Sequence, residues 1–338
     1  MSRYPSRVCF IAIFFKECFS ICRNSLWFSE ILITQNEYPP ADLWSEWLLR
    51  RRHGGNPNHE QVIRGVIERI RDRVLDGAAL SAGMTLVDVG AGDGLIAFGA
   101  LERIGLSLRV VFTDLSVPLL QHAEKCAIER GVRDCCTFLQ GSAERLEGIV
   151  DESVDVVTSR AVLAYVANKA AAVGEFYRVL KPGGRISIAE PIFRDEALQI
   201  AAHIRYLEAK PACDVTAHVR LMLRCKAAQF PSTTEEAIKN DPLINFSERD
   251  LVGLCQSAGF GEIHLELHID VRKAGALSWD TFIDMSPHPR APTIREILAS
   301  HFSDEEQRQY EEGLRPLVES GQRVERDTIA YLTAIKPR

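Results

Sequence analysis

The sequence predicts a doubly wound α/β fold, in which helices cover both faces of a mainly parallel sheet. From residue 84 onward, short apolar runs alternate with amphipathic helical stretches. One of these strands, at 85–89, runs into three closely spaced glycines and then into a helix. The chain has 338 residues, of which 46% are hydrophobic and 25% charged, so it is large and apolar enough to bury a core.

Residues 1–40 are predicted to be an apolar N-terminal extension that is poorly ordered, or that comes from translation assigned to too early a start. An apolar run at 8–15 follows two arginines, as in a signal peptide, but Lys16 and Glu17 end it and no small-residue cleavage site follows. No stretch is long and apolar enough for a membrane-spanning helix, so we expect no membrane partner.

Residues 41–83 are predicted to form a helical lid. Leu43, Trp44, Trp47 and Leu48 recur at helical spacing before the breaker Gly54-Gly55. A second helix follows, with apolar residues at intervals of three and four between 62 and 74 and arginines among the intervening positions. The two tryptophans either close over a ligand or simply dock the first helix on the core.

Residues 84–191 are predicted to form the core, in which strands alternate regularly with helices. The expected strands are 85–89, 109–113, 136–140, 154–158 and 185–189, and the expected helices are 95–104, 116–130 and 164–180. Ser116 is placed to cap the second helix, and Gly131 follows its end.

The remaining chain is predicted to return to the core twice. A cap insertion over 192–246 precedes a core continuation at 247–272, where Ser247 caps a helix to Ala258 and a strand follows at 263–271. A second helical insertion covers 273–326, and the last core strand lies in 327–338.

Charge and cysteine usage restrict the class of partner and the compartment. The formal net charge of −6 does not attract phosphate backbones, so we expect no nucleic-acid partner, although arginines gather between residues 50 and 73. The nine cysteines are scattered and contain no CxxC pair, which is typical of reduced thiols in a cytoplasmic protein and indicates no metal site.

The most informative segment is Asp88-Val-Gly-Ala-Gly-Asp-Gly94. Its glycines permit a tight turn and close approach of a ligand to the backbone, and the following helix N-terminus offers free N–H groups. The pattern departs from the dinucleotide fingerprint GxGxxG, because the third glycine comes one residue early and Asp93 intrudes. A carboxylate there repels a pyrophosphate and suits a cationic ligand; the alternative is a tight turn without a ligand.

This segment resembles the first motif of class I S-adenosylmethionine-dependent methyltransferases, and Arg178-Val-Leu-Lys-Pro-Gly-Gly-Arg185 resembles a later one. The resemblance covers 84–191 well and 247–271 and 328–335 more loosely, and it is nearest to the group of quinone-ring C-methyltransferases and arsenite methyltransferases. It implies a seven-stranded Rossmann-like sheet with an antiparallel last strand. It also implies that 84–191 binds S-adenosylmethionine.

The resemblance further implies the positions of the cofactor site. Asp114, at the end of the second strand, would accept hydrogen bonds from the ribose hydroxyls, or else act as a loop acid beside Ser116. The expected cofactor-binding residues are Asp88, Gly90, Ala91, Gly92, Asp93, Gly94, Asp114, Leu115, Ser142, Ala143, Ser159 and Arg160. Ser142 stands where the family often has an acid against the adenine.

The expected function is methyl transfer by in-line displacement to a small organic acceptor, for which positioning and water exclusion supply most of the acceleration. No catalytic residue is assigned. His53, Tyr165 and His203 are candidates for a general base by location, and a surface or core role is the alternative for each. The insertion at 192–246 is expected to wall a largely apolar acceptor pocket.

Other functions remain open at this point. Ala161 stands where arsenite methyltransferases carry an arsenic-binding cysteine, which argues against arsenite, although Cys213 and Cys225 could still meet. The second insertion either completes the pocket or forms a homodimer surface. The rival functions are a catalytically silent regulator that binds S-adenosylmethionine and a nicotinamide-dependent oxidoreductase.

Overall fold

The computed structural model describes residues 43–209, 214–232 and 234–338. The predicted extension at 1–40 lies outside the described residues, as does Cys213.

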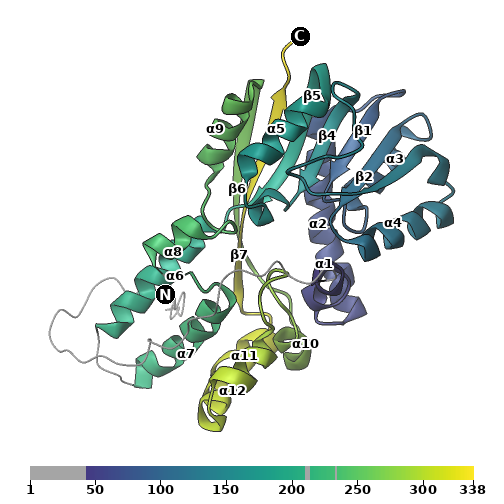
Figure 1. The fold of residues 1–338 in the computed structure, drawn as a ribbon. Coiled ribbons are helices and arrows are strands. Elements are labelled where there is room, and N and C mark those ends of the chain that lie inside the picture. The colour runs from purple at the N-terminus through teal and green to yellow at the C-terminus, as the bar shows by residue number, and fades with distance from the viewer. Residues whose placement is uncertain (1–42, 210–213, 233) are drawn as a thin grey trace, which may run out of the picture.

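A seven-stranded sheet in the order β3-β2-β1-β4-β5-β7-β6 organises the molecule (Figure 1). Its strands are β1 (Thr85–Val89), β2 (Arg109–Asp114), β3 (Cys136–Gln140), β4 (Val154–Arg160), β5 (Leu180–Pro191), β6 (Gly261–Lys273) and β7 (Val324–Ile335). The first five strands pair in parallel, and β7 is antiparallel to both β5 and β6. The doubly wound sheet with an antiparallel last strand is therefore confirmed.

The strand order places a crevice at the carboxyl ends of β1 and β4. From β1 the chain proceeds to β2 and β3 on one side, and β4 and β5 lie on the other. Val89 at the end of β1 pairs in register with Thr113 of β2 and Ser159 of β4. Ligands of open α/β sheets bind where the strand order reverses in this way.

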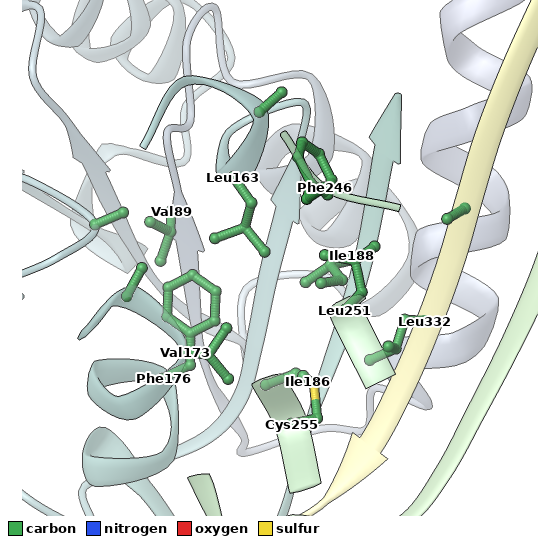
Figure 2. Close-up of a cluster of buried hydrophobic side chains, with 14 of the residues drawn as sticks. Val89, Leu163, Val173, Phe176, Ile186, Ile188, Phe246, Leu251, Cys255 and Leu332 are labelled. Carbon is green, nitrogen blue, oxygen red and sulfur yellow. The ribbon is translucent and has the colours of Figure 1, made fainter. Parts of the chain in front are cut away.

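Helices cover both faces of the sheet. They are α2 (Pro57–Ala78), α3 (Leu95–Ile104) and α4 (Val117–Glu129) on one face, and α5 (Lys169–Val179) and α9 (Glu248–Ala258) on the other. Figure 2 shows the second of these cores, in which Phe176 of α5 and Leu251 of α9 pack against Ile188 of β5 and Leu332 of β7. Burial of these apolar side chains drives the two layers onto the sheet.

Two predicted boundaries in the core are wrong. The helix expected at 164–180 begins only at Lys169, because Asn168 caps it by accepting the Ala171 N–H, and a short 3-10 turn, η3 (Leu163–Tyr165), precedes it. The strand expected at 185–189 extends from Leu180 to Pro191, since Leu180 pairs with Val154 of β4 and β7 pairs with the strand as far as Pro191.

The two insertions are helical, as predicted, except that strand β7 begins at Val324, inside the range 273–326 predicted for the second. They contain α6 (Arg194–Glu208), α7 (Asp214–Gln229) and α8 (Glu235–Asn240) in the first, and α10 (Trp279–Ile283), α11 (Ile294–His301) and α12 (Asp304–Glu319) in the second. Leu221 and Cys225 of α7 join a separate core with Trp279, Leu298 and Tyr310, so the two insertions pack together.

The N-terminal helices are fastened to the second insertion. They are α1 (Leu43–Leu49), the 3-10 turn η1 (Arg51–His53) and α2. The Trp47 indole N–H donates to the Ser286 carbonyl at 2.9 Å, and the Asn56 amide donates to the Thr281 hydroxyl at 3.0 Å. Arg51 also pairs with Glu296. Figure 1 shows α1 and α10 at the end of the sheet away from the chain's C-terminus.

Among the described residues, no helix combines the length and apolar character needed to cross a membrane. Within the described residues, free thiols occur at Cys126, Cys135, Cys136, Cys225 and Cys255. The same part of the chain contains no cluster of three or more side chains that could hold a metal ion.

Candidate cofactor and acceptor site

The glycine turn between β1 and α3 is shaped for close approach to its backbone. Gly90, Gly92 and Gly94 have φ angles of 64°, 57° and 82°, which L side chains rarely adopt. A Cβ at Gly90 would overlap Val162, and one at Gly94 would overlap Phe98. Gly94 precedes α3 without a side-chain cap, and the Ala97 N–H donates to Asp88, so the Leu95 and Ile96 N–H groups are the ones left for a ligand.

Asp114 ties the end of β2 to this turn. Its carboxylate accepts the Gly92 N–H at 2.9 Å through one oxygen and the Ser116 N–H at 2.8 Å through the other. Burial raises the pKa of Asp114, and the two backbone donors oppose that shift. The side chain therefore fixes the turn and also begins α4, where Ser116 caps the helix.

Asp114→Ala is expected to lower the affinity for S-adenosylhomocysteine about tenfold to hundredfold. The substitution removes the acceptor expected for the ribose hydroxyls and frees Gly92, and charge-assisted hydrogen bonds contribute roughly 1.5 to 3 kcal/mol. Calorimetry measures the affinity, and Asp134→Ala, at an exposed position, is the control. An unchanged dissociation constant would place the ribose contact elsewhere.

The other two carboxylates of the glycine motif face protein groups. Asp88 is 1% exposed, and its carboxylate accepts the Thr158 hydroxyl at 2.9 Å and the Ala97 N–H at 3.2 Å. Burial raises its pKa to about 7. Asp93 lies 3.6 Å from the Arg64 guanidinium, with a side chain that is only 11% exposed. Asp88 therefore supports the turn from behind, and Asp93 forms an ion pair beside it.

The loop after β4 is held by a carboxylate that the sequence analysis did not select. Glu190, at the end of β5, is fully buried and accepts the Val162 N–H at 3.0 Å and the Ala164 N–H at 3.2 Å. The Ser159 hydroxyl donates to it at 3.3 Å. Burial raises the pKa of Glu190, and these donors oppose the shift. An acid directly after the apolar run 186–189 is the signal that could have identified it.

Ala161 adopts a left-handed backbone in this loop. Its φ is 55°, and its N–H donates to the Ala189 carbonyl at 2.8 Å. A non-glycine residue with a left-handed backbone is strained, and the surrounding structure must hold it in that conformation. Such strained residues are frequent at functional sites. The chain therefore turns sharply where β4 reaches the crevice.

The residues expected near the adenine come together at the ends of β2 and β3. The Gly141 N–H donates to the Asp114 carbonyl at 3.0 Å, and the Ser142 hydroxyl accepts the Glu144 N–H at 3.2 Å. Ala143 is buried, whereas Leu115 is 43% exposed. Ser142 thus organises its own turn, and the exposed Leu115 side chain borders the crevice.

The three candidate bases lie in different environments. His53 is 5% exposed, and its Nε2 lies 2.9 Å from the Leu49 carbonyl oxygen. The Tyr165 ring packs edge-on against Trp44 at 5.0 Å, and burial raises its pKa. His203 is exposed on α6. His53 thus belongs to the N-terminal helices and Tyr165 contacts them, whereas His203 lies apart in the first insertion.

The N-terminal helices cover the crevice. A Cβ at Gly92 would stand 3.0 Å from the Leu48 side chain, so α1 lies directly over the glycine turn. Trp44 meets the loop after β4 through Tyr165, and Arg290 of the second insertion donates to the Tyr165 carbonyl at 3.1 Å. The glycine turn is therefore contacted by α1, and the loop after β4 contacts both α1 and the second insertion.

Comparison with known proteins assigns the core of the chain. Residues 87–188 match the methyltransferase domain family. The ubiquinone/menaquinone biosynthesis C-methyltransferase UbiE of Ruegeria sp. (strain TM1040) is 36% identical over 125 residues, which are 37% of this chain and 49% of that protein. The arsenite methyltransferase of Halobacterium salinarum is 30% identical over 115 residues, 34% of this chain and 29% of that protein.

The YcgJ protein of Bacillus subtilis, a solved structure, has a TM-score of 0.49 and 18% identity, and the match covers 81% of this chain and 98% of that one. The chain spans about half the length, or less, of the curated relatives it matches. Residues 87–188 therefore form a methyltransferase domain, as the motifs predicted. This part of the chain is similar to a UbiE C-methyltransferase and to an arsenite methyltransferase.

Proposed function

We propose that the protein transfers a methyl group from S-adenosylmethionine to a small organic acceptor. The observation that carries the proposal is the carboxylate bridge of Asp114, which ties the Gly90–Gly94 turn to the start of α4 at the carboxyl edge of the sheet. The positive φ angles of the glycines turn the backbone sharply at this edge, where ligands of open α/β sheets bind. These residues fit S-adenosylmethionine, which supplies a methyl group on a sulfonium that is also a good leaving group.

In this mechanism the chain binds, orients and excludes water. Asp114 would hold the ribose, the free N–H groups at the start of α3 would meet the methionine end, and Ser142 would lie beside the adenine. The loop fixed by Glu190 aims its backbone at the acceptor, while α1 with Trp44 closes the crevice from above. In-line positioning inside a dry pocket supplies most of the acceleration that such a displacement needs.

A small organic molecule is favoured over arsenite as the acceptor. Ala161 supplies no thiol at the loop after β4, and Cys225 is 2% exposed inside the core shared by α7 and the second insertion. Burial raises the pKa of Cys225, which disfavours the thiolate that binds arsenic.

Nucleic acid is not favoured either. Four arginines of the N-terminal helices pair with carboxylates, which leaves little free basic surface. The pairs are Arg51–Glu296, Arg64–Asp93, Arg71–Asp72 and Arg73–Glu266. A cytoplasmic location without a membrane partner, and a homodimer through the second insertion, complete the proposal.

Calorimetry with S-adenosylhomocysteine and NAD tests the cofactor. We expect S-adenosylhomocysteine to bind at least about tenfold more tightly, because the glycine spacing of the turn departs from that of pyrophosphate-binding turns and Asp93 stands inside it. Tighter binding of NAD would favour the oxidoreductase. Transfer of labelled methyl groups to a panel of small acceptors then separates an enzyme from a catalytically silent regulator.

A further inference from the structure

Arg52 differs from the arginines around it. Arg50 and Arg51 each pair with a glutamate, and Arg64 pairs with Asp93. The Nε and Nη1 atoms of Arg52 are buried and have no hydrogen-bond partner. Buried guanidinium donors without an acceptor cost free energy, so this group is poised for a partner that a ligand can supply.

The Arg52 side chain is held in place by an aromatic ring. Its guanidinium lies 5.8 Å from the centroid of the Trp47 ring, and the Trp47 indole N–H is fixed by the Ser286 carbonyl at 2.9 Å. A guanidinium stacked in this way presents its N–H groups along its edge. The second insertion therefore positions Arg52 through Trp47.

A second arginine without a partner lies close to the first. Arg160 ends β4, between Ser159 and the strained Ala161, and within the described residues its side chain has no ion pair or hydrogen bond. Burial, and then the charge of Arg160, lower the pKa of Arg52 to about 10. Two like charges are thus held near each other at the end of the crevice where the methyl group would be transferred.

The carboxylates near Arg52 and the loop after β4 have other neighbours, and Glu60 lies 4.0 Å from the His53 Nε2. Asp93 pairs with Arg64, and Glu190 is fully buried among the N–H groups of the loop after β4. Arg290 adds a third positive charge near Tyr165, where it lies 6.0 Å from the ring centroid. The single carboxylate of S-adenosylmethionine can pair with only one of Arg52 and Arg160, so the other is left for an anion on the acceptor.

We infer that Arg52 and Arg160 bind an anionic group of the methyl acceptor, a carboxylate or a phosphate. The inference rests on the proposed function and narrows it: the acceptor is an organic anion whose apolar part lies under α1. Guanidinium groups recognise both anions through paired N–H donors.

The test uses benzoate as an aromatic carboxylate and benzyl alcohol as its neutral counterpart. Each is titrated into the full chain saturated with S-adenosylhomocysteine. We expect the wild type to bind benzoate at least about tenfold more tightly, and Arg52→Gln and Arg160→Gln to abolish that preference. Arg50→Gln, at an exposed arginine paired only with Glu46, is the matched control and should change nothing.

The affinity for S-adenosylhomocysteine shows whether the arginines bind the carboxylate of the cofactor or an anionic group of the acceptor. We expect Arg52→Gln to stay within about twofold of the wild type in this affinity, a limit that does not extend to Arg160, which is among the expected cofactor-binding residues. A loss of about tenfold, with benzoate binding unchanged, would assign the arginines to the cofactor's own carboxylate and overturn the inference. Equal binding of benzoate and benzyl alcohol by the wild type would also overturn it.

Failure of the proposed function gives a different result. If the wild type binds no S-adenosylhomocysteine, the cofactor assignment is wrong, and benzoate titrated into the ligand-free protein then tests the arginine pair by itself. Should Arg52→Gln not fold, Arg160→Gln carries the comparison, because Arg160 lies at a strand end and supports no other described side chain.

Discussion

Glu190→Ala is expected to lower the free energy of unfolding by about 3 to 5 kcal/mol. The substitution leaves the Val162 and Ala164 N–H groups and the Ser159 hydroxyl without their acceptor in a fully buried place. It also releases the loop after β4, so methyl transfer should fall with stability. Denaturant unfolding and an activity assay on the same preparation measure both effects.

Glu190→Gln provides a graded comparison for this prediction. The amide keeps the side-chain volume but turns one oxygen into a donor that faces other donors, so a smaller loss of about 1 to 3 kcal/mol is expected. Glu147→Ala, at a side chain that is 67% exposed, is the control and should change stability by under about 0.5 kcal/mol. If Glu190→Ala were as stable as this control, the loop would not depend on the carboxylate.

Asp88 is expected to make stability fall as the pH rises from about 4 to about 7. Burial raises its pKa in the folded state to about 7 from the model-peptide value of 3.8, so the folded chain binds a proton that the unfolded chain has released. The sign is therefore opposite to that of an ion-paired carboxylate. Below pH 3.8 Asp88 is protonated in both the folded and the unfolded chain, so it does not reduce stability. Above about pH 7 its ionisation lowers the free energy of unfolding by about 4 kcal/mol.

Asp88→Asn tests this dependence, because an amide mimics the protonated acid. Its oxygen can accept the Ala97 N–H, and its NH₂ can donate to the Thr158 hydroxyl oxygen. The difference in free energy of unfolding between variant and wild type should move in favour of the variant as the pH rises from 4 to 7. Asp134→Asn, at an exposed residue, should show no such trend. A constant difference for Asp88→Asn would mean that the carboxylate ionises in the fold as easily as in water.

The sheet could be predicted from the sequence because its signals are local. Each strand of the core is an apolar run between turn residues, and the glycines of 90–94 require a backbone that few other residues adopt. Boundaries were less accurate where a partner decides them. β5 is extended by its pairing with β7, and α5 starts late because the Asn168 side chain caps it.

The parts of the site that the sequence did not reveal depend on contacts between distant segments. Glu190 lies 26 to 31 residues from the groups it binds, and no periodic pattern marks such a pair. Arg52 looked like one member of a basic cluster, and only the three-dimensional partners of its neighbours distinguish it. The resemblance to methyltransferases gave the expected cofactor residues but did not extend to these positions.

The attachment of α1 to the second insertion also affects the order in which the protein is made. The Trp47 indole and its acceptor carbonyl at Ser286 are 239 residues apart, so the first helix of the site leaves the ribosome long before its support is synthesised. At about 5 to 20 residues per second this delay is roughly 10 to 50 seconds, during which the Trp47 indole has no acceptor, although Leu48 and Trp44 can already meet the glycine turn and Tyr165. The parallel strands β1 to β5 can pair in that interval, whereas β7 and the support of Trp47 come only near the end of translation. A nascent chain truncated before residue 286 would therefore carry the glycine turn and Asp114 but lack the support that holds Trp47 over the site.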